Sequence, residues 1–185
     1  MYSVELMVAE HDNILKFIDV VRKACCGILD GREVNADDFE KMIAFARGYA
    51  DKHHHGKEEQ ILFAEMTQHL GPVTENLVRH GMLVEHDLGR LHIADLEAAL
   101  GHYREDPQTI HKLGILAGAA GYANLLERHI ARENEAVYPY AERQLPEDIR
   151  QSVEERTRAF EADAEARGVQ AHSLGILREL TEKYC

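Results

Sequence analysis

Two pairs of residues in the chain have the types and the spacing to bind a metal ion. His54 precedes Glu58 by four positions, and His129 precedes Glu133 by four. Residues four apart on an α-helix lie on the same face, so each pair can direct an imidazole nitrogen and a carboxylate oxygen at one point. Two such helices facing each other would supply most of the ligands of a two-metal site, with the carboxylates as bridges.

Apolar residues at helical spacing predict four long amphipathic helices, and each carries one histidine on its apolar face. The predicted helices cover residues 3–29, 36–69, 72–103 and 108–143, and the histidines are His11, His54, His86 and His129. Because the connections are short, we expect an all-α fold, an up-down-up-down antiparallel four-helix bundle. Ser3 is expected to cap the first helix, and Pro139 to kink or tighten the last turns of the fourth.

The last part of the chain predicts a helical extension, residues 144–185, packed on the bundle of residues 1–143. A charged helix with a thin apolar stripe is expected from Glu147 to Arg167, where Gly168 breaks it, and a short helix from Ser173 to Tyr184. We expect these helices to cap the bundle or to mediate formation of a homodimer.

A second His-x-x-x-Glu pair, His55 with Glu59, lies one residue out of phase with the first. His54 and Glu58 continue the apolar stripe of the predicted helix, whereas the second pair points about 100° away from it. We therefore predict His54 and Glu58 as ligands, and expect His55 and its neighbour His53 to flank the site or to face solvent.

The donor atoms restrict the metal. Carboxylates are almost never fully buried unless they are paired or bind a metal, although any single histidine on an apolar stripe is more often a core residue. Imidazole with bridging carboxylate and no thiolate suits iron or manganese, with zinc as a further choice. Cys25, Cys26 and Cys185 are an odd number with two adjacent, which is a poor disulfide framework and is typical of reduced thiols in a cytoplasm.

Composition disfavours several classes of partner. The formal net charge is −12, which argues against nucleic-acid binding and against an anionic membrane surface. No apolar run is long enough to cross a bilayer, and Met1-Tyr2-Ser3 leads into an amphipathic pattern without a signal peptide. We therefore expect a cytoplasmic protein with no nucleic-acid or membrane partner.

Four segments together resemble hemerythrin-like proteins, the His-His-Glu cation-binding family. Residues 51–63 (DKHHHGKEEQILF) resemble the second-helix motif and residues 127–139 (ERHIARENEAVYP) the fourth, while Glu10-His11-Asp12 and Glu85-His86-Asp87 resemble the first- and third-helix histidines. The resemblance covers about residues 1–143. It implies a four-helix bundle around two non-haem iron ions, with manganese or zinc less expected. It further implies bridging by Glu58 and Glu133, and terminal ligation by His11, His54, His86 and His129.

One departure from that family affects the expected function. Oxygen-carrying hemerythrins have a fifth ligand histidine one turn before the third-helix histidine, and Met82 stands at that position here. Tyr122 lies seven residues before His129, so it either contacts the metals or belongs to the core. We expect a protein that binds or senses O2 or NO. The alternatives are an enzyme that reduces peroxide or NO with electrons from a partner protein, an iron donor for repair, or a structural His-rich bundle.

Overall fold

The computed structural model describes residues 1–185 and contains helices and short connections but no strand, which confirms the all-α prediction. Wide π-helical segments, labelled η, interrupt several of the α-helices. The elements are α1 (Tyr2–Leu29), α2 (Ala36–Phe45), η1 (Ala46–His55), η2 (Glu58–Leu62), α3 (Phe63–His69), α4 (Gly71–Leu77), η3 (Val78–Met82), α5 (Leu83–Glu105), α6 (Thr109–Arg132), η4 (Glu133–Val137), α7 (Tyr138–Gln144), α8 (Glu147–Ala166) and α9 (Val169–Tyr184).

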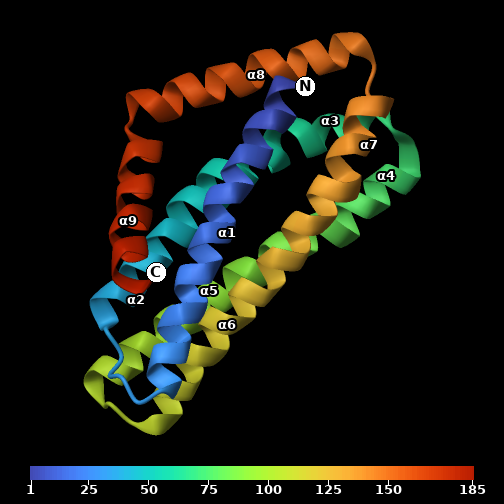
Figure 1. Ribbon diagram of the computed structural model, residues 1–185. Helices are drawn as coiled ribbons and strands as arrows, with labels where there is room; N and C mark the ends of the chain where they lie inside the picture. The colour runs from blue at the N-terminus through green and yellow to red at the C-terminus, as the bar shows by residue number, and fades with distance from the viewer.

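These elements join into four long helical stretches with ends close to those predicted from the apolar spacing. The second stretch runs from α2 to α3, the third from α4 to α5 and the fourth from α6 to α7 (Figure 1). Asn35 caps the second stretch by accepting a hydrogen bond from the Asp38 amide. Gly71, with φ of 77°, allows the sharp turn after the single non-helical residue Leu70.

Two local predictions are wrong, and one of the two effects expected of Pro139, a tightened turn, is not found. Ser3 lies inside α1 rather than at its cap, because its amide and hydroxyl donate to Glu154 of α8, at 3.3 and 3.4 Å. The last helix begins at Val169, four residues early, because Gly168 alone, with φ of 68°, makes the turn from α8. Pro139 follows a widened turn, η4, rather than a tightened one, because the ring lacks the N–H that an α-turn would need.

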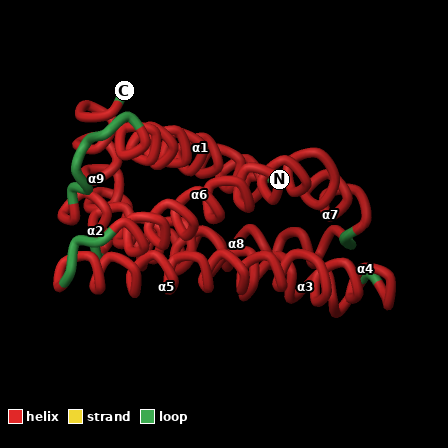
Figure 2. The backbone as a smooth tube through the Cα atoms, turned by 90° about the horizontal axis from the view of Figure 1, so that it is seen from below, coloured by secondary structure: helices red, strands yellow, loops and turns green.

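The four helical stretches lie roughly alongside one another (Figures 1 and 2), whereas α8 runs at a steep angle across them (Figure 1). α5 lies along α6, α1 packs against α6, and α2 packs against α5. α8 crosses the N-terminal part of α1 and contacts η2, and α9 packs against α1, α2 and η1. None of these helices is both long and apolar enough to cross a membrane.

The apolar core is divided into two clusters. One contains Phe17, Phe45 and Tyr122, and the other contains Phe63, Met82 and Tyr138. On each of the four long stretches, the predicted ligand residues fall in the sequence between members of one cluster and members of the other. The fold therefore holds these polar residues in a layer between two apolar regions.

Candidate metal centre

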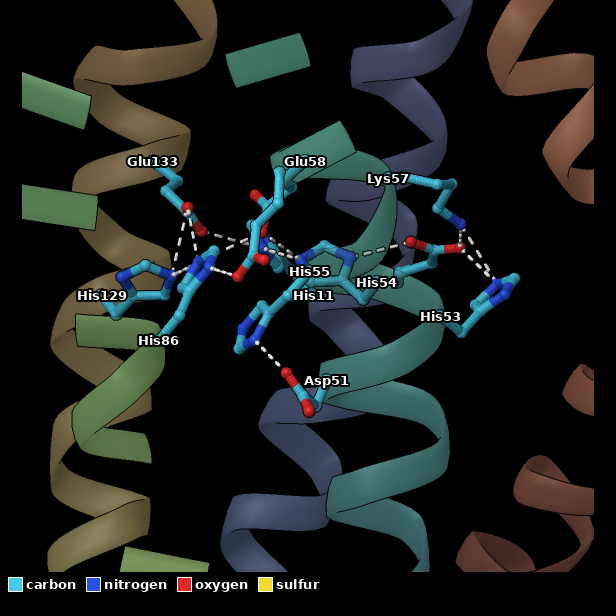
Figure 3. Close-up of polar contacts among 12 residues, drawn as sticks. His11, Asp51, His53, His54, His55, Lys57, Glu58, His86, His129 and Glu133 are labelled. Atoms are coloured by element: carbon cyan, nitrogen blue, oxygen red, sulfur yellow. Dashed lines mark hydrogen bonds and ion pairs between the residues drawn. The ribbon is translucent and has the colours of Figure 1, made fainter. Parts of the chain in front are cut away.

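Four histidines, one from each helical stretch, converge as two pairs in this layer (Figure 3). The Nε2 atoms of His11 and His54 are 2.8 Å apart, and those of His86 and His129 are 3.0 Å apart. All four side chains are buried. The sequence placed one histidine on each predicted helix, and the structure brings all four together.

Two buried glutamates lie between the pairs and reach both of them. Glu58 Oε2 is 3.7 Å from His54 Nε2 and 3.5 Å from His86 Nε2. Glu133 Oε2 is 3.3 Å from His11 Nε2, and its Oε1 is 3.1 Å from His129 Nε2. Both glutamates have an exposed fraction of 0%. Each carboxylate thus lies close to nitrogens of both histidine pairs.

The outer nitrogen of each histidine is held by an acceptor on a neighbouring helical stretch. The pairs are His11 Nδ1 with Asn134 at 2.8 Å, His54 Nδ1 with Glu10 at 2.8 Å, His86 Nδ1 with Glu59 at 2.7 Å, and His129 Nδ1 with Glu85 at 2.8 Å. Because carboxylate and amide oxygens accept, each Nδ1 carries a proton, and Nε2 is the nitrogen that each ring directs at the centre. Glu133 raises the pKa of His11 and of His129, so a metal ion would displace the Nε2 protons of these two rings when it binds.

The carboxylate oxygens facing these nitrogens lack hydrogen-bond partners. Glu58 Oε2 and both oxygens of Glu133 are buried and unpaired, although histidine nitrogens lie close to them. A buried carboxylate without a partner is costly, so the arrangement requires a cation or protons between the two glutamates.

The electrostatics of the metal-free site lead to the same requirement. Burial, together with the negative charge of Glu133, raises the pKa of Glu58 well above its usual value. Burial and the nearby His11 lower the pKa of His54 to about 4, so this imidazole is neutral at neutral pH and ready to bind a metal. A metal cation would allow both carboxylates to stay ionised.

The donor set fits metal ions in number, type and spacing. Two nitrogens that bind one metal ion at a right angle, each at about 2.1 Å, lie about 3.0 Å from each other. The Nε2 atoms within the two histidine pairs have similar separations, 2.8 and 3.0 Å. The nitrogen and oxygen atoms form two overlapping groups that share Glu58. One is His11, His54, Glu58 and Glu133, and the other is His55, Glu58, His86 and His129. Imidazole and carboxylate without thiolate suit iron, manganese or zinc.

Of the two positions expected for His55, the structure excludes the one that faces solvent. Only 3% of His55 is exposed, and its ring lies beside the site, stacked on that of His86 with centroids 3.8 Å apart. The π-helical segment η1 is the reason, because its wider turn places three consecutive histidines, His53 to His55, inside the protein. The i, i+4 rule on which the sequence prediction rested assumes a regular α-helix.

Tyr138 is a second residue that the sequence did not indicate. Its hydroxyl donates to Glu58 Oε1 and lies 3.5 Å from His11 Nε2, and its ring stacks on that of His11. η4 brings it there, since in a π-helix residues five apart, here Glu133 and Tyr138, are the hydrogen-bonded neighbours. Tyr122, for which contact with the metals and a core position were both considered, belongs to the first apolar cluster.

A pocket reaches the site from the side of η1 and α5. Its volume is about 180 Å³, and His55, His86, Tyr122, Asp51 and Arg90 are among its lining residues. Arg90 pairs with Asp51 at 2.7 Å and with Glu59 at 2.6 Å. The pocket is large enough to hold a molecule of a few atoms beside the pair formed by His86 and His129.

Comparison with known proteins identifies the family. The model of the hemerythrin HHE cation-binding domain matches residues 2–141, so the chain belongs to this family. The search of curated proteins and the search of solved structures both found no match. The family is described as a cation-binding domain, and the buried His and Glu groups of this chain could hold a metal ion.

Proposed function

We propose that the chain binds two iron ions and that this centre binds or senses O2 or NO. The observation that carries the proposal is the pair of buried glutamates, Glu58 and Glu133, whose unpaired oxygens face histidine nitrogens on both sides. His11 and His54 would hold one ion, His86 and His129 the other, and both glutamates would bridge them. Membership in a cation-binding family supports the proposal.

The finer description of the fold belongs to the same proposal. We infer an up-down-up-down antiparallel four-helix bundle over residues 1–143 and an extension over residues 144–185. The order of the four helical stretches and the short turns between them support this topology.

The side chains prepare the centre for a small ligand. Iron held by these histidines and glutamates would supply the exchangeable electrons and the binding position for a small ligand. The outer hydrogen bonds hold the four histidines with Nε2 directed inward, and the two apolar clusters exclude water above and below the polar layer. The 180 Å³ pocket beside His55 and His86 gives a small molecule a route to the site.

Iron content and visible absorption test this proposal. The purified chain is loaded with ferrous iron without oxygen, and its spectrum is recorded before and after addition of O2 or NO. We expect two irons per chain and a new visible band with one of the gases. A band that disappears on removal of the gas indicates binding, whereas continued consumption of NO or peroxide with a reductant indicates an enzyme. A chain without stoichiometric iron contradicts the proposal.

Glu58→Ala tests the bridging role directly. The substitution removes the carboxylate shared by the two groups of donors, so we expect the variant to lose stable binding of two irons. Glu127→Ala is the matched control, because Glu127 is exposed and pairs with Arg22. Two tightly bound irons in Glu58→Ala would contradict the assignment.

A further inference from the structure

Lys57 is a fully buried cation next to the proposed metal centre. Only 1% of the residue is exposed, and its ammonium group donates to Glu10 of α1 and to Glu161 of α8. The Nζ atom also lies 3.1 Å from Nε2 of His53 (Figure 3). Lysine is almost never buried without partners, so the two carboxylates are what keep this ammonium inside the protein.

The same network ends at a histidine of the centre. Glu10 binds Lys57 through Oε1, and its Oε2 accepts the hydrogen bond from Nδ1 of His54 at 2.8 Å. Glu161 is in turn held by a hydrogen bond from Gln170 of α9. A continuous series of contacts therefore runs from both helices of the extension through Lys57 and Glu10 to His54.

Two other histidines of the centre also pair with a glutamate that binds a cationic side chain, but neither of these cationic side chains pairs with a residue of the extension. Glu59 links His86 to Arg90, and Glu85 links His129 to Arg132. The side chains of these arginines are 39% and 49% exposed, compared with 1% for Lys57, so solvent screens their charges. The link through Lys57 is buried, and it is the one of the three that ends in α8.

We propose that the C-terminal extension helps to hold a metal-binding side chain of the centre in place. Glu161 is a positioning residue that, through Lys57 and Glu10, fixes the orientation of His54. This inference rests on the proposed function. It adds that one of the two metal positions, the one on the His11 and His54 side, depends on α8 for its affinity and its environment.

The physical reason is the shared ammonium group. With Glu161 present, two carboxylates hold Lys57 between α1 and α8, and Glu10 keeps one oxygen free for His54. Without Glu161, the ammonium retains a single carboxylate partner and moves with it toward solvent. Glu10 then no longer presents a fixed acceptor to the imidazole, and loss of such an outer partner weakens metal binding about 10- to 100-fold.

Glu161→Ala, Glu161→Gln and Glu161→Asp in the full chain test the proposal. We expect Glu161→Ala to bind the first ferrous ion as the wild type does and the second about tenfold more weakly in an anaerobic titration. With iron-57, the Mössbauer signal of one iron should change and that of the other should stay. Glu161→Gln keeps an oxygen acceptor for Lys57 but removes the charge, so it should weaken binding of the second iron less than Glu161→Ala does. Glu161→Asp keeps the charge but has a shorter side chain, so it should bind the second iron as weakly as Glu161→Ala does. This variant tests the proposal if the alanine variant does not fold.

Arg156→Gln is the matched control. Arg156 also joins α8 to the bundle, but it binds Glu65 and the Gln60 carbonyl and does not reach a candidate ligand. We expect this variant to retain both affinities and both Mössbauer signals. Equal losses in Arg156→Gln and Glu161→Ala, or unchanged binding in Glu161→Ala and Glu161→Asp, would overturn the inference. A wild-type chain that binds no iron would overturn the proposed function itself.

Discussion

Each histidine of the centre donates its outer hydrogen bond to a residue adjacent in sequence to another candidate ligand. Glu10 precedes His11 but holds His54, and Glu85 precedes His86 but holds His129. In the same way, the neighbours of the two proposed bridges, Glu59 and Asn134, hold His86 and His11. Neighbouring residues on a helix point about 100° apart, so one member of each dipeptide faces the centre and the other faces the adjacent helix. A single turn of helix thus supplies both a ligand and an orienting group.

Tyr138→Phe is expected to destabilise the metal-free protein. The substitution keeps the ring that stacks on His11 but removes the hydroxyl that donates to Glu58 Oε1. A buried carboxylate oxygen would lose its only donor, which costs about 1–3 kcal/mol of the free energy of unfolding. With metal bound, the cation compensates the charge of Glu58 and the loss should be smaller. Urea unfolding of both forms measures the difference.

Tyr140→Phe is the control for this substitution. The Tyr140 hydroxyl pairs with Thr74 at 3.0 Å and does not contact the candidate ligands. Its loss should have the same effect on stability with and without metal. If Tyr138→Phe behaved in the same way, the hydroxyl would have no role toward Glu58 that depends on the charge of the centre.

The residues that the sequence indicated and those that it missed differ in one respect. The apolar stripes placed His54 and Glu58 toward the core because those stripes depend only on regular helical spacing. His55 and Tyr138 reach the centre through wide turns, and no residue type marks such a turn in a single sequence. Lys57 was missed because a lysine is normally an exposed residue, and only the position of α8 explains its burial.

The wide turns are the feature of the elements that matters most for the centre. η1 and η2 lie on either side of residues 56 and 57, η3 ends four residues before His86, and η4 begins at Glu133. π-helical turns are uncommon and often occur at functional sites, because they change which side chains face inward. The predicted ends of the four long helical stretches agree closely with the structure since they depend on Gly, Pro and polar residues, whereas the internal wide turns leave no such signal.

The contact between α5 and α6 depends on a glycine. A Cβ atom at Gly118 would lie 2.9 Å from the Leu96 backbone nitrogen, and a backbone cannot give way as a flexible side chain does. We expect Gly118→Ala to lower the free energy of unfolding by about 1–3 kcal/mol, because overpacking outweighs the better helix propensity of alanine.

Gly101→Ala is the opposite case on α5. Nothing lies within 4 Å of a Cβ added there, so the helix propensity of alanine should raise stability by about 0.5–1 kcal/mol. Chemical denaturation of both variants checks the pair. If Gly118→Ala were as stable as the wild type, the two helices would be able to separate without cost.

At the scale of the whole molecule, a polar layer separates two apolar clusters and is closed on one side by the extension. A layer with six candidate ligands and several unpaired oxygens reduces the stability of the metal-free fold. The four helical stretches were predictable because each stripe is continuous. The contacts of α8 and α9 were not, because a thin apolar stripe on a charged helix does not specify the surface on which it packs.

Removal of metal is therefore expected to lower the stability of the whole molecule. A ligand that binds only the folded state, present at about 100 times its Kd, adds about 2.7 kcal/mol to the free energy of unfolding. Chelation under anaerobic conditions should lower the Tm, and addition of ferrous iron should restore it in proportion to the metal bound. The effect should be much smaller in Glu58→Ala, which lacks the shared carboxylate, but unchanged in Glu127→Ala. Equal Tm values for the metal-free and metal-bound wild type would mean that the polar layer is fully compensated without a cation, which the unpaired oxygens of Glu58 and Glu133 argue against.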